Sequence, residues 1–400
     1  MQTKTIGGKS RAALSLIFVI MLMDVVGITL LAPVAPYIVQ KYSSSALMVS
    51  MLTVLYAGGQ FFSAPLIGKL GDRYGRRPVL LISLFGQAIG YLIFGIGGAL
   101  WILFLGRIIG GITGGNLSTA SAYIADVSKP EERSKNFALI GMAWSVGLIL
   151  GPAVGGLLGQ FNLQAPAYAA AGLSLLNVLV GIFILPESLP LERRETARMR
   201  PNDFNPIVAI FEMARKPGLG WLLLVTALFN FAFNGINSTS TLFVIQKFSA
   251  QPWHLSLLLG LGGIAVGAST FILVPRLVPR FGDNKVATVS LIAQSIFDVS
   301  IFFVPLFWPI FPLNMLVSAI SAFTFPTLTT LSTDLVLHRE VGLLMGVTTG
   351  LGSLMNIFGP LWAGAMYDHV MVGAPYWMGA VILVVAGVML MKPVIRLETG

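Results

Sequence analysis

The chain has 400 residues, of which 56% are hydrophobic and only 10% are charged, and it carries a formal net charge of +9. Its mean hydropathy of +0.84 excludes an ordinary soluble globular domain. The chain contains no cysteine, which excludes disulfide frameworks and thiolate metal sites. These values predict an all-α protein embedded in a membrane.

Apolar segments of about 20 residues, long enough to cross a hydrocarbon core of about 30 Å as a helix, recur from one end of the chain to the other. The first is expected to be an uncleaved helix rather than a signal peptide, because Asp24 lies in its middle. We predict twelve transmembrane helices, over residues 12–37, 46–67, 79–99, 101–125, 137–160, 165–186, 219–246, 254–275, 286–306, 309–334, 341–366 and 374–394.

The second half of the chain repeats the first at offsets of 206 to 209 residues. Gly151-Pro152, for example, is echoed by Gly359-Pro360. A duplication of this kind predicts two pseudo-symmetric six-helix bundles, which we place at residues 1–186 and 218–400.

The two bundles are joined by one long polar segment, residues 187–217. Several of its apolar residues fall on one helical face, which predicts a short helix lying on the inner membrane surface. An ordinary linker is the alternative. The residues of this face are Phe204, Ile207, Val208 and Phe211.

Basic residues gather on one side of the predicted helices. With the N-terminus inside, 22 of the 25 Lys and Arg residues lie in cytoplasmic segments, while Lys41 and Lys247 lie outside and Arg107 lies within a helix. The positive-inside rule therefore predicts that both termini are cytoplasmic. The positive net charge then reflects an inner surface facing anionic lipid, so nucleic acid is not an expected partner.

The sequence shows no motif for a cofactor or a catalytic reaction. Gly7–Ser10 resembles the end of a nucleotide-binding loop, but Thr3 stands where the first glycine is needed, so we do not expect ATP as the energy source. His254, His338 and His369 lie near helix ends, away from any carboxylate or nucleophile in the sequence. We therefore expect no enzyme activity, no cofactor and no metal.

Three charged residues lie inside predicted helices, where each costs on the order of 2.5–3.5 kcal/mol unless it faces a cavity or a partner. Asp24 lies near the midplane, where desolvation favours a protonated carboxyl group, so it is the leading candidate to carry a coupling proton. Its alternatives are contact with a cationic substrate and a carboxylate held by neighbouring hydroxyls. Arg107 is expected to stabilise a carboxylate or a hydrogen-bond network, with a structural role as the alternative. Asp298 lies either in the cavity of the second half or near its outer mouth.

Glycines recur at every fourth position in the fifth predicted helix. Small residues at this spacing allow neighbouring helices to approach closely in lipid. The helix-packing residues that we expect here are Gly147, Gly151, Pro152, Gly155 and Gly156.

The segment Gly68–Arg77 joins the second and third predicted helices and reads G-K-L-G-D-R-Y-G-R-R. It resembles the cytoplasmic signature loop of the major facilitator superfamily, G-x-L-x-D-R-x-G-R-R/K. The resemblance implies a gate that holds the two halves together in the outward-facing state, with a solvated charge cluster as the alternative. The second copy, Arg276–Asp283, has Pro279 where the first has Asp72, so the switch is expected to work fully in the N-terminal half alone. The gating candidates are Gly68, Asp72, Arg73, Gly75, Arg76 and Arg77, with Asp126 and Arg133 as candidate partners.

The whole chain resembles the twelve-helix drug:proton antiporters of this superfamily, the branch that contains tetracycline and multidrug exporters. Besides the signature loop, Arg107–Gly111 and Gly147–Gly156 carry the resemblance. It implies proton-coupled efflux of lipophilic small molecules by alternating access, driven by the proton-motive force, and it gives Arg107 a part in proton translocation. We expect a monomer in the inner membrane, in contact with membrane lipid. A lipid or lipid-precursor flippase and a proton-coupled nutrient symporter are the alternatives.

The sequence departs from the tetracycline exporters at Gly90 and Gln294, the places where those proteins carry intramembrane aspartates. This departure favours other lipophilic substrates over tetracycline. A cavity for such compounds needs aromatic faces and a few polar groups. The candidate substrate-binding residues are Tyr56, Gln60, Phe62, Asn116, Tyr123, Phe233, Asn234 and Asn237.

Overall fold

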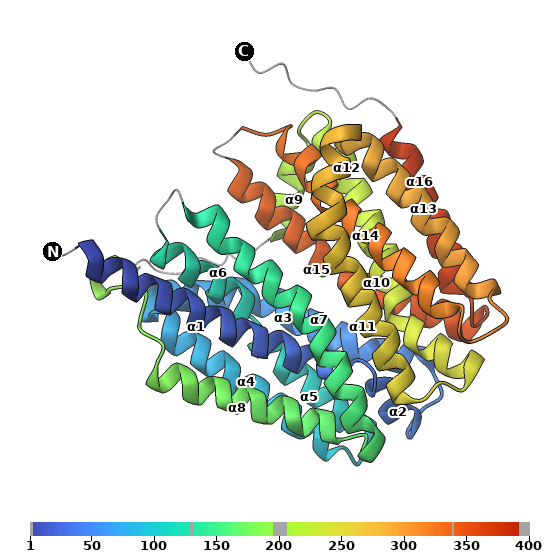
Figure 1. The fold of residues 1–400 in the computed structure, drawn as a ribbon, viewed down its shortest axis with the longest axis horizontal. Helices are drawn as coiled ribbons and strands as arrows, with labels where there is room; N and C mark the ends of the chain where they lie inside the picture. Colours follow the sequence, from blue (N-terminus) through green and yellow to red (C-terminus); the bar gives the residue numbers. More distant parts are fainter. Residues whose placement is uncertain (1–2, 129–131, 195–205, 338–339, 392–400) are drawn as a thin grey trace. The chain divides into compact units, whose positions relative to one another are not determined.

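The computed structural model describes residues 3–128, 132–194, 206–337 and 340–391, and in this part of the chain helices dominate (Figure 1). Eleven described helical segments are long and apolar enough to cross a membrane, and a shorter apolar helix, α16 (Ala374–Leu390), follows them. The all-α fold with a set of membrane helices, predicted from composition and apolar runs, is confirmed.

In the first half of the chain, two of the predicted spans are each divided into two consecutive helices. Residues 31–34 interrupt the first span, and Gly114 and Gly115 interrupt the fourth. The predicted fourth span, residues 101–125, is thus formed by two consecutive helices within the membrane-spanning segment Leu100–Val127. The helices are α1 (Thr3–Leu30), α2 (Ala35–Gln40), α3 (Ala46–Tyr74), α4 (Arg76–Ile96), α5 (Leu100–Thr113), α6 (Asn116–Val127), α7 (Arg133–Phe161) and α8 (Ala165–Phe183).

In the second half a π-helical segment, Ser269–Leu273, connects α11 (Pro252–Ala268) to α12 (Val274–Phe281) without ending the span. A short helix in the polar linker, α9 (Pro206–Ala214), lies where an amphipathic helix was expected, although Phe204 falls outside the described residues. Its position on a membrane surface stays a prediction. The remaining helices are α10 (Leu219–Phe248), α11 (Pro252–Ala268), α12 (Val274–Phe281), α13 (Asp283–Phe303), α14 (Ile310–Thr333) and α15 (Val341–His369).

The signature segment is almost entirely helical rather than a loop. α3 runs to Tyr74 and α4 begins at Arg76, so Gly75 alone makes the turn, with φ of 105°. Gly282 makes the equivalent turn between α12 and α13, with φ of 80°. A positive φ is readily adopted by glycine and strained for other residues, which explains why both copies of the segment turn at this residue.

Helix packing repeats in the two halves of the chain. α1 packs on α7 and α8, and α4 packs on α5 and α8. The helices that occupy the same places in the repeat pack in the same way, α10 on α15 and α16, and α13 on α14 and α16. The internal repeat seen in the sequence is therefore also a repeat in three dimensions.

Contacts between residues divide the chain into two compact units. Each holds most of one half of the chain and a short piece of the other, because the start of α3 belongs to the second unit and the start of α11 to the first. The first unit is Met1–Tyr42, Leu55–Phe204 and Pro252–Gly260; the second is Ser43–Val54, Asn205–Gln251 and Leu261–Gly400.

Within the second unit, a side chain of α15 caps the first turn of α3. The Asp368 carboxylate accepts hydrogen bonds from the backbone N–H groups of Ala46 and Leu47, at 2.7 and 3.0 Å, and from the Ser45 hydroxyl. The first N–H groups of a helix have no partner within the helix, and their partial positive charge attracts an anion. Asp368 thus ties the start of α3 to the end of α15.

Candidate functional site

Asp24 lies in α1 with only 5% of its surface exposed, and a chain of polar side chains continues from it. Asn116 Nδ2 donates to Asp24 Oδ1 at 3.1 Å and to Gln87 Oε1 at 2.8 Å, and Gln87 Nε2 donates to the Tyr91 hydroxyl at 3.3 Å. Asn116 is the first residue of α6, directly after the Gly114–Gly115 break. The break thus starts a new helix with a buried amide beside the carboxylate.

Arg107 of α5 and Tyr56 of α3 extend this group. Tyr56 and Tyr91 both lie near Asp24 and Arg107. The Arg107 guanidinium lies 4.9 Å from the centre of the Phe94 ring, a cation–π contact. Among the described residues, the buried Arg107 Nε and Tyr56 hydroxyl have no hydrogen-bond partner. We call Asp24, Asn116, Gln87, Tyr91, Tyr56 and Arg107 the polar cluster.

Unpartnered buried polar atoms are costly, at about 1–3 kcal/mol each, so they mark places where a further group is expected. Among the described residues, the polar cluster holds three of them beside an embedded carboxylate: Arg107 Nε, the Tyr56 hydroxyl and Asn116 Oδ1. An acceptor atom of a water molecule or of a ligand would satisfy Arg107 Nε, and a water molecule or a polar group of a ligand would satisfy the Tyr56 hydroxyl. The Asp24 carboxylate beside them is a group that can take up or release a proton.

Asp298 occupies a similar place in the second unit. It lies on α13, is 2% exposed and is hydrogen-bonded to Gln294. Asp298 Oδ2 and Gln294 Oε1 have no hydrogen-bond partner in the described part of the chain. The structure therefore places Asp298 in a buried site rather than in an open mouth.

Gln87 was missed in the sequence, although the repeat carried a signal for it. Ser83 and Gln87 of α4 recur 207 positions later as Ser290 and Gln294 of α13, and all four are buried. In the first unit the glutamine reaches Asp24 through Asn116, whereas in the second it contacts Asp298 on its own helix. A serine and a glutamine at the same places of an apolar span in both copies of the repeat would have indicated Gln87 as a candidate.

Gly90 lies at a close approach of α4 and α5. A methyl group at Gly90 would lie 2.7 Å from the Gly106 carbonyl oxygen and 2.9 Å from the Gly110 nitrogen. Both contacts are to backbone atoms, so a larger residue at Gly90 requires the helices to separate. The packing of α4 against α5 in this structure is therefore incompatible with an aspartate at position 90.

Arg76 connects the gating candidates. It is 9% exposed, and its guanidinium pairs with Asp72 at 2.5 Å and with Asp126 at 3.2 Å. It also donates to the Gly68 carbonyl oxygen at 3.4 Å. Arg77 donates to the carbonyl oxygens at the end of α8, including that of Gly181 at 3.2 Å.

The structure shows no part in this network for Arg73, and it does not describe the side chain of Arg133. Arg73 is exposed, with its guanidinium 5.6 Å from the Tyr74 ring centre. Arg133 begins α7, but its side chain lies outside the described residues. Its pairing with Asp72 stays a prediction.

Glu187 belongs to the same network and was missed as a functional residue. Its carboxylate accepts hydrogen bonds from the backbone N–H groups of Arg76, Ser188 and Leu189, at 2.9, 3.0 and 3.1 Å. The Ser188 hydroxyl donates to Asp126 at 3.1 Å. The end of the first bundle is thus fastened to the turn at Gly75. The sequence held no stronger signal than an acidic residue at a span end.

The glycines of α7 lie against two neighbouring helices. Thr29 Oγ1 of α1 donates to the Gly147 carbonyl oxygen at 3.0 Å, and a methyl group at Gly155 would lie 2.1 Å from the Leu30 carbonyl oxygen. Gly156 faces α11, where a methyl group would lie 1.6 Å from Ser256 Oγ. Gly151 and Pro152 are buried in the same helix. The glycine stripe packs α1 on one side and the start of α11 on the other.

The remaining N-terminal candidates for substrate contact are dispersed. Gln60 Nε2 donates to the Gly114 carbonyl oxygen at 2.7 Å, which supports the break between α5 and α6. Phe62 is 78% exposed. Tyr123 is fully buried and donates to the Pro186 carbonyl oxygen at 2.9 Å, so no face of it is open to a ligand in this conformation.

In the second unit, three candidates lie on α10. Phe233 stacks on Phe229 with ring centres 5.5 Å apart, and Asn237 donates to the Phe233 carbonyl oxygen at 2.8 Å. Asn234 is half-buried and Asn237 is exposed. Their contact with a substrate stays a prediction.

Comparisons with known proteins agree with this architecture. The family model of the Major Facilitator Superfamily matches residues 17–360 and 254–398. The tetracycline resistance protein, class C, of Escherichia coli is 36% identical over 365 residues, covering 90% of each chain. Multidrug resistance protein 2 of Bacillus subtilis is 27% identical over 361 residues, covering 88% of this chain and 89% of the relative. The crystal structure of the human organic anion transporter MFSD10 (TETRAN) is similar with a TM-score of 0.72 and 25% identity, covering 95% of this chain and 99% of that one.

Proposed function

Because this chain belongs to the Major Facilitator Superfamily, we propose that it exports lipophilic small molecules in exchange for protons by alternating access. Its relatives include resistance proteins for tetracycline and for multiple drugs, at 36% and 27% identity. These relatives are transporters rather than enzymes. The proposed coupling mechanism rests on one observation: the Asp24 carboxylate is buried and accepts a hydrogen bond from the Asn116 amide.

Asp24 is the group that we propose to bind the coupling proton. Desolvation penalises its charged form, while the amide of Asn116 stabilises that form, so the two terms oppose each other. In the proposed mechanism, a change in these surroundings loads or releases the proton. Substrate and proton compete because both act on the same buried charge.

Arg107 does not release its own proton in this scheme, because a guanidinium stays charged in proteins. Its role is to stabilise the charge of the polar cluster after proton release. Tyr56 lies near both Arg107 and Asp24, and in the proposed mechanism it links the two. Asp298 is a second candidate for a coupling carboxylate, in the other unit.

The proposed substrates are lipophilic compounds of several kinds rather than tetracycline alone. Gly90 supports this breadth, because the close contact of α4 with α5 leaves no room for the carboxylate of the tetracycline exporters at this position. Tetracycline is nevertheless a necessary compound in any test, since the class C resistance protein is 36% identical. Recognition would then rest on aromatic and amide groups.

We place the protein in the inner membrane as a monomer with both termini in the cytoplasm. The support for this orientation is the 22 to 2 distribution of basic residues between the two sides. The energy source in this proposal is the proton-motive force, and each proton that enters at 100 mV contributes about 2.3 kcal/mol. No cofactor is required.

Proteoliposomes of the purified protein test this mechanism. A pH step should drive accumulation of the lipophilic cation ethidium or of tetracycline by the wild type. Asp24→Asn keeps the side-chain volume and fixes a neutral group, so it should abolish accumulation while substrate binding becomes independent of pH between about 5 and 8. Asp298→Asn is the comparison variant, because it neutralises the second candidate carboxylate, and it should still accumulate substrate if Asp24 binds the coupling proton.

Three outcomes would contradict the proposal. Accumulation by Asp24→Asn equal to that of the wild type would move the coupling site elsewhere, with Asp298 the next residue to test. Uptake of a nutrient together with protons, in place of drug exchange, would identify a symporter. Movement of a fluorescent lipid between leaflets without drug transport would identify a flippase.

A further inference from the structure

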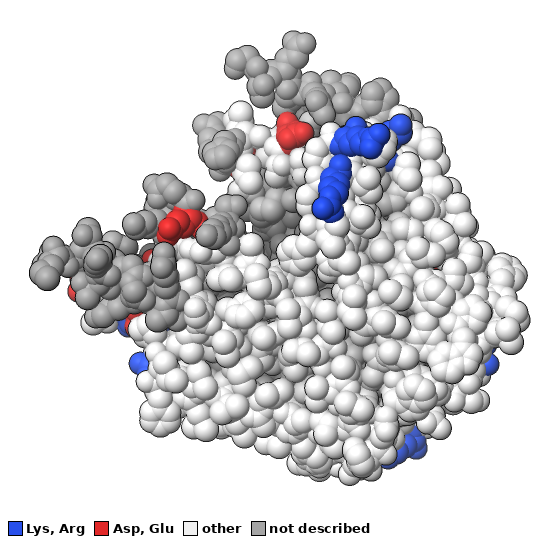
Figure 2. All heavy atoms as spheres, in the orientation of Figure 1, with Lys and Arg blue, Asp and Glu red and all other residues white. Residues whose placement is uncertain are grey.

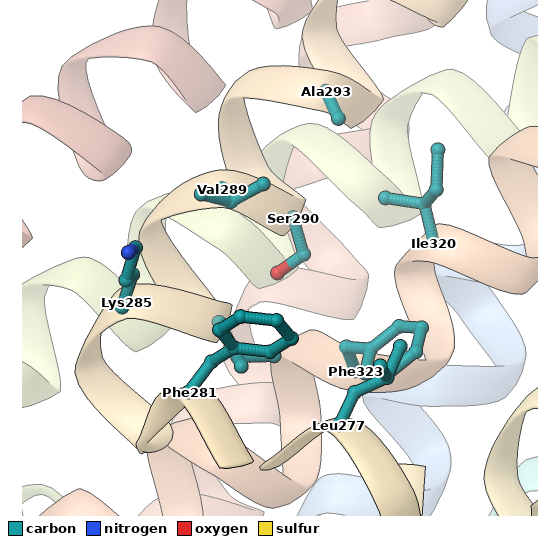
Figure 3. A pocket seen from close by; sticks show the side chains of 9 residues that line it. Leu277, Phe281, Lys285, Val289, Ser290, Ala293, Ile320 and Phe323 are labelled. Atoms are coloured by element: carbon teal, nitrogen blue, oxygen red, sulfur yellow. The ribbon is translucent and has the colours of Figure 1, made fainter. Parts of the chain in front are cut away.

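A half-open cavity of about 340 Å³ lies at one end of the second unit, between α12, α13 and α14. Figure 3 shows side chains of all three helices around it. Two of these side chains, Phe281 and Val289, are 48% and 57% exposed, so the cavity opens on the outer side of these helices. Its lining residues are Leu277, Phe281, Lys285, Val286, Val289, Ser290, Ala293, Ile320 and Phe323.

The interior of this cavity is apolar. Ser290 is the polar residue of the lining apart from Lys285, and its hydroxyl is already engaged with the Ala287 carbonyl oxygen at 2.9 Å and with Thr324 Oγ1 at 3.1 Å. Next to the cavity, Ser269 Oγ donates to the Ala319 carbonyl oxygen at 2.7 Å and fixes the π-helical segment to α14. The space therefore accepts a hydrocarbon group and offers no polar atom deep inside.

Positive charge borders the cavity on its polar side. Lys285 Nζ lies 5.9 Å from the ring centre of Phe281, which puts the ammonium group at the edge of the apolar space (Figure 3). Arg276 and Arg280 of α12 are exposed nearby, and Figure 2 shows a group of basic side chains over this region. Residues 276–285 hold three basic side chains against one acidic residue, Asp283.

We propose that this cavity binds an anionic phospholipid, with one acyl chain in the apolar space and the phosphate held by Lys285 and Arg280. A long apolar group joined to an anionic head matches both the lining and the charged edge. Basic pockets between membrane helices bind anionic head groups in this way. In the proposed topology this end of the helices faces the cytoplasmic leaflet, where anionic lipids concentrate.

The inference goes beyond drug export, because neither Asp24 nor a transported compound takes part in it. The cavity is lined by helices of the second unit, and the polar cluster lies in the first. Failure of this proposal would leave the transport mechanism untouched. Conversely, a protein that transports nothing would still show the lipid site.

Native mass spectrometry of the full-length protein in a non-ionic detergent tests whether the cavity binds an anionic phospholipid. Phosphatidylglycerol and phosphatidylcholine with identical acyl chains are added in equal amounts, and the bound lipids are counted. Lys285→Gln with Arg280→Gln should lower phosphatidylglycerol affinity about fivefold for each charge removed, with little effect on phosphatidylcholine. Val289→Trp should fill the cavity and remove the preferred phosphatidylglycerol adduct.

Matched controls separate the site from the general surface. Lys41→Gln removes an exposed basic residue elsewhere, and Ile82→Trp enlarges an apolar side chain of α4 that is 70% exposed. Both should bind phosphatidylglycerol as the wild type does. Thermal unfolding supplies a second readout, because phosphatidylglycerol should stabilise the wild type more than Val289→Trp.

The following results would overturn the proposal. Equal binding of the two lipids by the wild type would show that the site does not select anionic lipid. Unchanged binding in Val289→Trp would show that the cavity is not occupied. Displacement of phosphatidylglycerol by inorganic phosphate alone would identify an anion site, and displacement by ethidium would assign the cavity to the drug pathway.

Discussion

Gly155 of α7 lies against the backbone of α1. A methyl group there would meet the Leu30 carbonyl oxygen at 2.1 Å, and a backbone atom cannot move aside as a flexible side chain does. Gly155→Ala should therefore force the helices apart and destabilise the protein by about 1–3 kcal/mol. The measurement is thermal unfolding of the purified protein in detergent.

Gly172 supplies the control for this substitution. It lies in α8, where a methyl group would have no heavy atom within 4 Å. Gly172→Ala should leave stability unchanged or raise it, because alanine favours a helix over glycine by up to about 1 kcal/mol. Equal melting temperatures for Gly155→Ala and the wild type would show that the close approach of α1 and α7 carries no stability.

At this scale the sequence identified the charges but not their partners. Asp24, Arg107 and Asp298 were found because a charged residue inside an apolar span is costly and therefore informative. The hydrogen bonds that join Asp24 to Gln87 through Asn116 were not predicted. They depend on how three helices are rotated about their axes, which an apolar pattern does not determine.

The first turn of α3 depends on a residue more than 300 positions away in the chain. Asp368 accepts hydrogen bonds from two backbone N–H groups at the start of α3 and from Ser45. Asp368→Ala leaves these donors without the carboxylate and should cost about 0.5–2 kcal/mol, the usual range for loss of a helix cap. Asp368→Asn should recover part of this loss, since an amide oxygen still accepts hydrogen bonds.

Asp334 provides the comparison for this element. It is an exposed carboxylate at the other end of a helix, the C-cap of α14. Asp334→Ala should change the melting temperature little. A loss of stability in Asp334→Ala as large as that in Asp368→Ala would show that removing a carboxylate near any helix end has this effect and that capping of α3 is not its cause.

The sequence predicted where each membrane helix lies, but it did not predict the residues at which the helices begin and end. Runs of apolar residues indicated every span, because a membrane imposes a minimum length. The predicted starts at residues 79 and 286 were each three residues late, since the helices begin directly after Gly75 and Gly282. We expected basic residues such as Arg76 to lie in a loop between the helices. In the structure Gly75 alone makes the turn, and the basic residues on either side of it lie on helices.

The molecule as a whole is a repeat in both sequence and packing, but its two copies differ where chemistry is expected. α1 with α7 and α10 with α15 are equivalent contacts. The polar cluster, with its arginine, lies in the first unit, while Asp298 has one glutamine as its hydrogen-bond partner in the second. The repeat was visible in the sequence, and the difference in surroundings became visible through contacts between helices.

The signature segment shows a second difference between the copies. Asp72 pairs with Arg76, which also pairs with Asp126, and the equivalent of Asp72 in the second copy is Pro279. Proline offers no side-chain charge, so the second copy cannot form this network. We expect a switch between transport states to depend on the first copy alone.

Asp72→Asn tests this expectation on the intact transporter. The substitution removes one ion pair of Arg76 in the signature segment, away from the buried polar cluster, so it should alter the balance between states rather than the contacts of a substrate. Loss of one charge-assisted pair should shift that balance by about 1–3 kcal/mol. Transport rates in proteoliposomes should fall severalfold while the affinity for ethidium, measured by fluorescence, stays near that of the wild type. Pro279→Ala, at the matched position, should leave both unchanged, and a parallel loss of binding and transport in Asp72→Asn would argue against a gate.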